Sequence, residues 1–358
     1  MNKHIRPLIL IAISALLMAS CSKHLNKDKT QETIIYPAPP DTARIQFLTT
    51  LRNSQDISPK RSGFSKYVVG ESAPVSIQKP YGITMYNGRM FICDGEIRAM
   101  DILDFNKNTY TQFRPKGQGQ FKFPINCFTD DNGLLYVADV DRRQIVVFDR
   151  QDNYLTAFGD TGNFKPTDVF VSGDKIYVSD AKNGRINIYR KGRYNLIDYI
   201  PKYQKGDSGF LFQPTNVYVA NNRIYASDFG DFKIKEYTLD GTFIKSVGSY
   251  GKSLGQFVRP KGIAVDSSGN LFVVDAGFEN VQIFNNEGKL LMFFGGSYKG
   301  PGDMWLPAKV VLDYTNLKYF EKYVNKNYKL NYLIFVSNQY GPDKINVYGA
   351  ISPASGKK

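Results

Sequence analysis

Short apolar runs separated by polar turn sequences occupy most of the chain and recur in a fixed order. Each unit opens with a proline and a partly alternating stretch, as at Pro80–Tyr86. A second run ends in a small residue followed by Asp, as at Leu135–Asp139, and a third has the form Ile-x-Val-Phe, as at Ile145–Phe148. Runs of this length, rich in Val, Ile, Tyr and Phe and bounded by turn residues, indicate β-strands. The pattern predicts an all-β protein.

This order of runs repeats six times. The repeats begin at Pro80, Pro124, Pro166, Pro214, Pro260 and Pro307, at spacings of 42 to 48 residues. Their second runs end at Asp94, Asp139, Asp180, Asp228, Asp275 and Asn338. A fourth run closes each unit, as at Phe243–Val247. We therefore expect a six-bladed β-propeller of four-stranded antiparallel blades, because a β-sandwich would not repeat at a fixed period.

One predicted strand, Arg44–Leu51, precedes the first repeat and has no repeat of its own. A free outer edge on the last blade would favour aggregation. We expect this strand to complete blade six, so that the propeller spans residues 44–350 and residues 351–358 form a tail.

The sixth repeat carries an insertion at residues 313–331. Leu317, Phe320 and Val324 within it follow a helical spacing, which predicts a short amphipathic helix. Strand order places the insertion on the face opposite the blade prolines. It either caps that end of the central channel or forms a docking element rich in Tyr and Lys.

The fifth repeat carries the fullest family pattern: Gly255-Gln-Phe257, Pro260, Asp275 and Asn280-Val-Gln-Ile-Phe284. These repeats resemble the NHL family, and the resemblance covers roughly residues 44–350. It implies a six-bladed propeller that presents its loops to a partner. Some propellers of this kind are instead lyases or calcium-dependent lactonases.

The N-terminus has the features of a secretory signal. Basic residues precede an apolar stretch from Leu8 to Ala19, which is too short to span a bilayer. Met18-Ala19-Ser20-Cys21 resembles the bacterial lipobox. We expect cleavage after residue 20 and lipidation of Cys21, including palmitate, which would hold the protein at a membrane surface. The alternative is an ordinary signal peptide with a chance cysteine.

Residues 21–43 are polar and then proline-rich, which predicts a tether between the lipid and the propeller. No acidic cluster follows Cys21. That absence favours an outer-membrane lipoprotein of the bacterial cell envelope that faces the periplasm.

The two histidines, His4 and His24, both lie outside the repeats, so most zinc and histidine-base mechanisms are excluded there. The net charge of the 358-residue chain is +13. Strand order gathers basic residues on the face where the blade prolines lie, here called the proline face. They include Arg98, Arg142, Arg143, Lys182, Arg185, Lys233, Arg259, Lys261 and Lys299. Such a ring would attract an anionic partner, or it would only keep the protein soluble.

Three further features have two interpretations each. The repeated Asp residues either accept backbone hydrogen bonds in tight loops, which is favoured, or form a ring for metal binding or catalysis. Trp305, the single tryptophan, either packs between blades or contacts a partner. Cys93 and Cys127 are expected to be buried thiols, although an oxidising compartment would also permit a disulfide.

These observations favour a non-enzymatic, membrane-anchored binding propeller. The expected partner is a protein or an anionic glycan or lipid of the envelope, with no nucleic acid. The candidate contact residues are Trp305, Arg98, Arg142, Arg143, Arg185, Lys233 and Arg259, and no catalytic residue is assigned. The alternative is a lactonase or lyase that uses calcium, with no other cofactor expected.

Overall fold

The computed structural model describes residues 33–58 and 73–354. The predicted signal peptide, the predicted lipidation site Cys21 and residues 22–32 of the predicted tether lie outside the described residues. Among the described residues, the helical segments are all too short or too polar to cross a membrane.

The described chain forms six antiparallel sheets, which confirms the six-bladed β-propeller. Blade one contains β3 (Pro80–Tyr86), β4 (Arg89–Asp94), β5 (Ala99–Asp104) and β6 (Thr109–Phe113). Blade two contains β7 (Pro124–Thr129), β8 (Leu135–Asp139), β9 (Gln144–Phe148) and β10 (Tyr154–Phe158). Blade three contains β11 (Pro166–Ser172), β12 (Lys175–Asp180), β13 (Arg185–Arg190) and β14 (Leu196–Ile200).

The last three blades follow the same order. Blade four contains β15 (Pro214–Ala220), β16 (Arg223–Asp228), β17 (Lys233–Thr238) and β18 (Phe243–Val247). Blade five contains β19 (Pro260–Val265), β20 (Leu271–Asp275), β21 (Asn280–Phe284) and β22 (Leu290–Gly295). Blade six contains β23 (Pro307–Asp313), β24 (Tyr328–Asn338), β25 (Ile345–Pro353), β2 (Ile45–Leu51) and β1 (Ile35–Tyr36).

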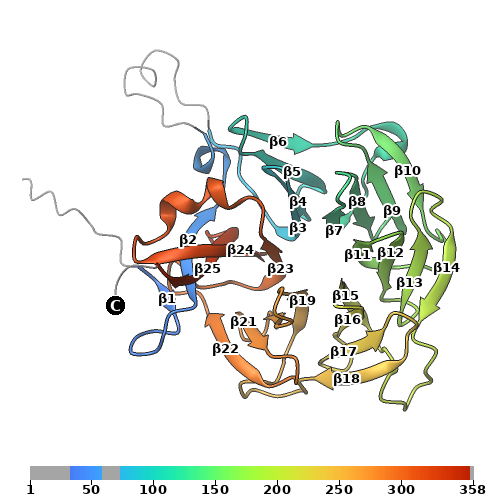
Figure 1. Ribbon diagram of the computed structural model, residues 1–358. Coiled ribbons are helices and arrows are strands. Elements are labelled where there is room, and N and C mark those ends of the chain that lie inside the picture. The colour runs from blue at the N-terminus through green and yellow to red at the C-terminus, as the bar shows by residue number, and fades with distance from the viewer. Residues whose placement is uncertain (1–32, 59–72, 355–358) are drawn as a thin grey trace, which may run out of the picture. The chain divides into compact units, whose positions relative to one another are not determined.

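The inner strands β3, β7, β11, β15, β19 and β23 surround the axis, and each contacts the next around the ring (Figure 1). Glycine permits a close approach at two of these contacts. A Cβ on Gly82 would lie 2.4 Å from Cα of Asn126, and one on Gly262 would lie 2.6 Å from Cα of Lys309. The axis is therefore bounded by tightly packed backbone.

Blade six closes the ring as predicted, because β2 pairs with β25 along its length. The prediction that residues 21–43 form only a tether is wrong for the part that is described. β1 pairs with β2, and the Tyr36 ring packs near Phe294 and Tyr348, so apolar residues fasten this segment to the propeller. The predicted tail likewise begins too early, since β25 extends to Pro353.

The insertion does not form the predicted amphipathic helix. It forms two 3₁₀ turns, η3 (Leu317–Tyr319) and η4 (Glu321–Tyr323). Phe320 lies between them and is buried against Phe105 of blade one and Phe335 of blade six. Burial of this one ring holds the chain in short turns that join the first and last blades. Two further 3₁₀ turns are η1 (Ser54–Asp56) and η2 (Gly117–Gly119).

Candidate functional site at the proline face

The repeated Asp residues are structural, as favoured above. Asp275 accepts hydrogen bonds from the backbone N–H groups of Val258 and Arg259, before the blade proline, and of Gly277 and Phe278 in the following loop. Asp94 makes the same set of bonds to residues 78, 79, 96 and 97. Each carboxylate thus ties an interblade connection to a tight loop of its own blade.

Within the described residues, no group of three or more His, Cys, Asp or Glu side chains could hold a metal ion. The carboxylates at the blade ends instead satisfy the backbone around them.

The positions that differ between blades lie directly after the blade prolines. Two residues after the proline, the six blades have Gly82, Asn126, Asp168, Asn216, Gly262 and Lys309. Asn126, Asp168, Asn216 and Lys309 are all buried. One residue after the proline, blades one and five carry Tyr81 and Lys261. Together Tyr81, Asp168, Lys261 and Lys309 form what we call the axial cluster.

An ion pair crosses the axis within this cluster. Nζ of Lys309 on blade six lies 2.7 Å from Oδ2 of Asp168 on blade three, the opposite blade of the ring. The same carboxylate oxygen accepts hydrogen bonds from Nδ2 of Asn216 and the backbone N–H of Val217 on blade four. Asp168 therefore connects three inner strands, and the charge of Lys309 is compensated.

Lys261 has a different environment. Its Nζ lies 5.1 Å from the centre of the Tyr81 ring, and the residue is 8% exposed. Burial, with the nearby charges of Arg259 and Lys79, lowers the pKa of Lys261 to about 8. Burial and the charge of Asp168 raise the pKa of the Tyr81 hydroxyl, so it stays protonated.

Two further cations lie beside Lys261. Arg259 and Lys79 each directly precede a blade proline, on blades five and one. Arg259 is exposed and Lys79 is half-buried. Lys79 Nζ lies 5.1 Å from the ring centre of Tyr340, which is itself exposed. Among the described residues, no carboxylate forms an ion pair with Lys79, Arg259 or Lys261. These three cations therefore gather at one end of the axis with their side chains unpaired among the described residues.

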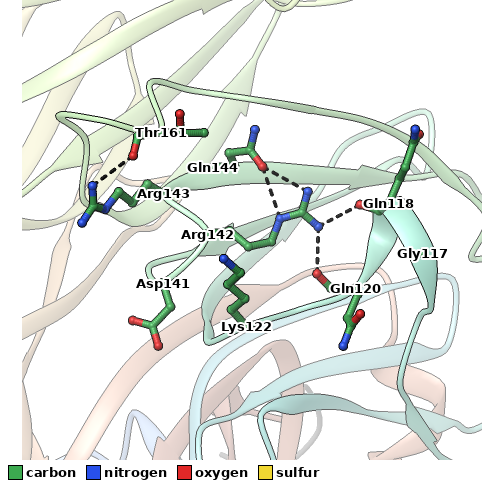
Figure 2. Close-up of a pocket in the computed structure, with 9 residues that line it drawn as sticks. All are labelled: Gly117, Gln118, Gln120, Lys122, Asp141, Arg142, Arg143, Gln144 and Thr161. Atoms are coloured by element: carbon green, nitrogen blue, oxygen red, sulfur yellow. Dashed lines mark hydrogen bonds between the residues drawn. The ribbon is translucent and has the colours of Figure 1, made fainter.

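Two of the predicted contact residues stabilise local backbone. Arg142 donates to the carbonyl oxygens of Gln118 and Gln120, each at 2.8 Å, and to the side chain of Gln144 (Figure 2). Arg143 donates to the carbonyl oxygens of Thr161 and Gly162. Both lie in a polar surface hollow of about 660 Å³ on blade two, formed where these arginines tether neighbouring loops.

The other predicted residues are dispersed around the proline face. Arg185 lies over the Tyr199 ring and 3.8 Å from Asp180, and Lys233 pairs with Asp231. Arg98 lies 5.9 Å from the centre of the Phe123 ring. Trp305 is 47% exposed and stacks on Tyr298 at 6.1 Å, so it both packs and presents a surface. Of the seven candidate contact residues predicted from the sequence, only Arg259 lies beside the axial cluster.

Sequence reasoning missed Tyr81, Asp168 and Lys309, and it counted Lys261 only as one basic residue among many. The sequence did contain a signal for this site. The residue types at the two positions after each blade proline differ from blade to blade, whereas those at neighbouring positions repeat. The pairing itself joins residues 141 positions apart, which spacing along the chain does not reveal.

Both body cysteines are buried and free of disulfides, as favoured. Cys127 Sγ lies 3.7 Å from the carbonyl oxygen of Phe91. Burial raises the pKa of the Cys93 thiol well above its ordinary value, so this group is unreactive in the folded protein.

Comparison with models of known protein families gives no match. Short segments resemble two curated proteins: Protein brain tumor of Drosophila melanogaster (32% identity over 65 residues) and Tripartite motif-containing protein 2 of Ailuropoda melanoleuca (35% over 57 residues). These segments are 18% and 16% of this chain. The chain spans only 6% and 8% of the lengths of these two relatives.

Solved structures share the fold more widely. A Bacteroides thetaiotaomicron protein of unknown function aligns with a TM-score of 0.58 at 15% identity, over 86% of this chain and 76% of that one. A Xanthomonas campestris gluconolactonase aligns with a TM-score of 0.53 at 15% identity, over 86% of this chain and 98% of that one. A virginiamycin B lyase from Staphylococcus aureus, inactivated by a histidine-to-alanine substitution and solved with quinupristin, aligns with a TM-score of 0.53 at 13% identity. The alignment covers 76% of this chain and 95% of that one. At these identities the likeness supports the six-bladed fold alone.

Proposed function

We propose that this protein is a membrane-anchored lipoprotein of the NHL type that binds an anionic group of an envelope partner on its proline face. The observation that carries the proposal is the grouping of Lys79, Arg259 and Lys261 at the end of the axis, where none of the three side chains has an ion-pair partner among the described residues. A cluster of like charges with low-dielectric walls attracts counter-charge and loses strength as salt rises. The partner class is a protein or an anionic glycan or lipid.

A pull-down from detergent-solubilised envelope tests this proposal. We expect the double variant Lys79→Glu, Arg259→Glu to lose the partner. The matched control Lys116→Glu, Lys122→Glu, which changes the charge equally at exposed residues of the connection between blades one and two, should retain it. High salt should weaken capture by the wild type. Equal recovery with both variants would contradict the proposal.

The anchor is a separate part of the proposal, resting on the lipobox-like sequence that ends in Cys21. Metabolic labelling with a palmitate analogue should mark the wild type and not Cys21→Ser. The variant should also leave the membrane fraction. Labelling that persists in Cys21→Ser would contradict lipidation at this residue.

A second candidate function is catalysis, and the lowered pKa of Lys261 favours it. With a pKa of about 8, roughly a tenth of this amine is unprotonated at pH 7 and could act as a base. Hydrolysis of glucono-δ-lactone by the wild type, abolished in Lys261→Met, would support this function. A large rise in melting temperature with added calcium would support the metal-dependent form. Absence of both effects would favour binding alone.

A further inference from the structure

We propose that Lys261 anchors an anion subsite at the proline-face end of the propeller axis, which takes a terminal carboxylate or phosphate group. This inference rests on the binding function proposed above and names the chemical group that enters the site.

Three lysines of the described chain are buried, and they differ in whether a carboxylate neutralises them. Lys309 pairs with Asp168 at 2.7 Å, and Lys235 pairs with Asp228 at 3.1 Å and Asp231 at 2.8 Å. Among the described residues, Lys261 has no carboxylate partner, and its ammonium lies over the Tyr81 ring. Burying an ammonium without a counter-charge is unfavourable, and an anion bound from outside would offset this cost.

The side chain of Lys261 reaches across the end of the axis. It originates on blade five, but its ammonium lies over Tyr81 on blade one. Blade six lies between these two blades and has the small residue Ala308 at the equivalent position. The ammonium is therefore positioned by inner strands and not by a loop.

The surroundings of Lys261 also favour a negatively charged group. Arg259 and Lys79 are close enough to lower its pKa, so an anion there would interact with three cations. The carboxylate of Asp168 does not compete with an external anion for Lys261, because Lys309 neutralises it.

Calorimetric titration at low ionic strength with inorganic phosphate and with acetate tests the subsite. We expect saturable binding of at least one anion by the wild type, weakened tenfold or more in Lys261→Met. Lys122→Met, which removes an exposed charge, should bind within twofold of the wild type. Phosphate binding alone would point to a phosphate source, and acetate binding alone to a carboxylate. Lys261→Gln serves as a second variant if Met disturbs the fold.

The pH dependence provides a second readout. The charged and titratable groups that act on Lys261 are Arg259, Lys79 and Tyr81, and Tyr81 in turn lies near the Asp168–Lys309 pair. Affinity should fall as pH rises through about 8, where Lys261 loses its proton, and this fall should be absent in Lys261→Met. Equal affinity in wild type and Lys261→Met, or no saturable binding, would overturn the subsite.

The two proposals can fail separately. Partner capture that depends on Arg259 and Lys79, but with no anion binding at Lys261, would retain the proposed function and reject the subsite. Anion binding at Lys261 with partner capture unaffected by Lys79→Glu, Arg259→Glu would retain the subsite and reject the proposed function.

Discussion

The ion pair across the axis gives a quantitative test of how the propeller is held together. Asp168 is fully buried and the Lys309 side chain is 10% exposed, so neither charge is well solvated. Removing one partner of such a pair leaves an uncompensated buried charge and costs about 3–5 kcal/mol. Asp168→Asn keeps the shape of the side chain while removing its charge. We expect it to lower the free energy of unfolding by about 3–5 kcal/mol, and Lys309→Met to have a similar effect.

The double variant Asp168→Asn, Lys309→Met should cost far less than the sum of the two single changes, because it leaves no orphaned charge. Urea unfolding monitored by the fluorescence of Trp305 measures all three values. The control is Lys289→Met, which breaks the exposed pair with Glu287 and should cost about 0–1 kcal/mol. Single substitutions that each cost less than about 1 kcal/mol, or strictly additive effects, would refute this reasoning.

Three other predictions concern buried positions elsewhere in the blades and on the inner strands. Burial and the nearby charge of Asp94 raise the pKa of Asp101 from 3.8 to about 8, so between these values the folded state holds a proton that the unfolded state has released. Stability should therefore fall as pH rises from about 4 to about 8. Urea titrations should show a flatter dependence of stability on pH for Asp101→Asn, and an unchanged dependence would contradict this prediction. Gly82→Ala should cost about 1–3 kcal/mol by forcing a Cβ into the neighbouring inner strand, while Gly300→Ala, which meets nothing within 4 Å, should cost much less; equal thermal shifts would argue against tight packing at the axis. Thiol titration of the body cysteines should be slow in the native protein and rapid in denaturant, and fast native labelling would contradict their burial.

The fold could be predicted from the sequence because each blade buries the same kinds of residue at the same places. A repeated Pro and a repeated Asp mark backbone connections that every blade must make, as the four N–H groups around Asp275 illustrate. Closure by β2 followed from a single leftover strand with no repeat of its own. The repeated Pro and Asp and the extra strand can all be recognised from the order of residues along the chain.

The site could not be predicted in the same way because it is built from differences between blades. Lys309 and Asp168 meet only when opposite blades of a closed ring face each other, and Lys261 of blade five lies over Tyr81 of blade one, two blades further along the ring. Arg142 was expected to face a partner, but its guanidinium is used by backbone carbonyls close to it in space. The turn formed around Phe320 also depends on contacts between the first and last blades.

The most direct measurement of the central claim is a crystal structure of the protein grown with inorganic phosphate or acetate. We expect an anion within hydrogen-bond distance of Nζ of Lys261, with Arg259 and Lys79 turned towards it. A structure in which Lys261 instead pairs with a carboxylate of its own chain, or in which the anion occupies only exposed lysines, would contradict it.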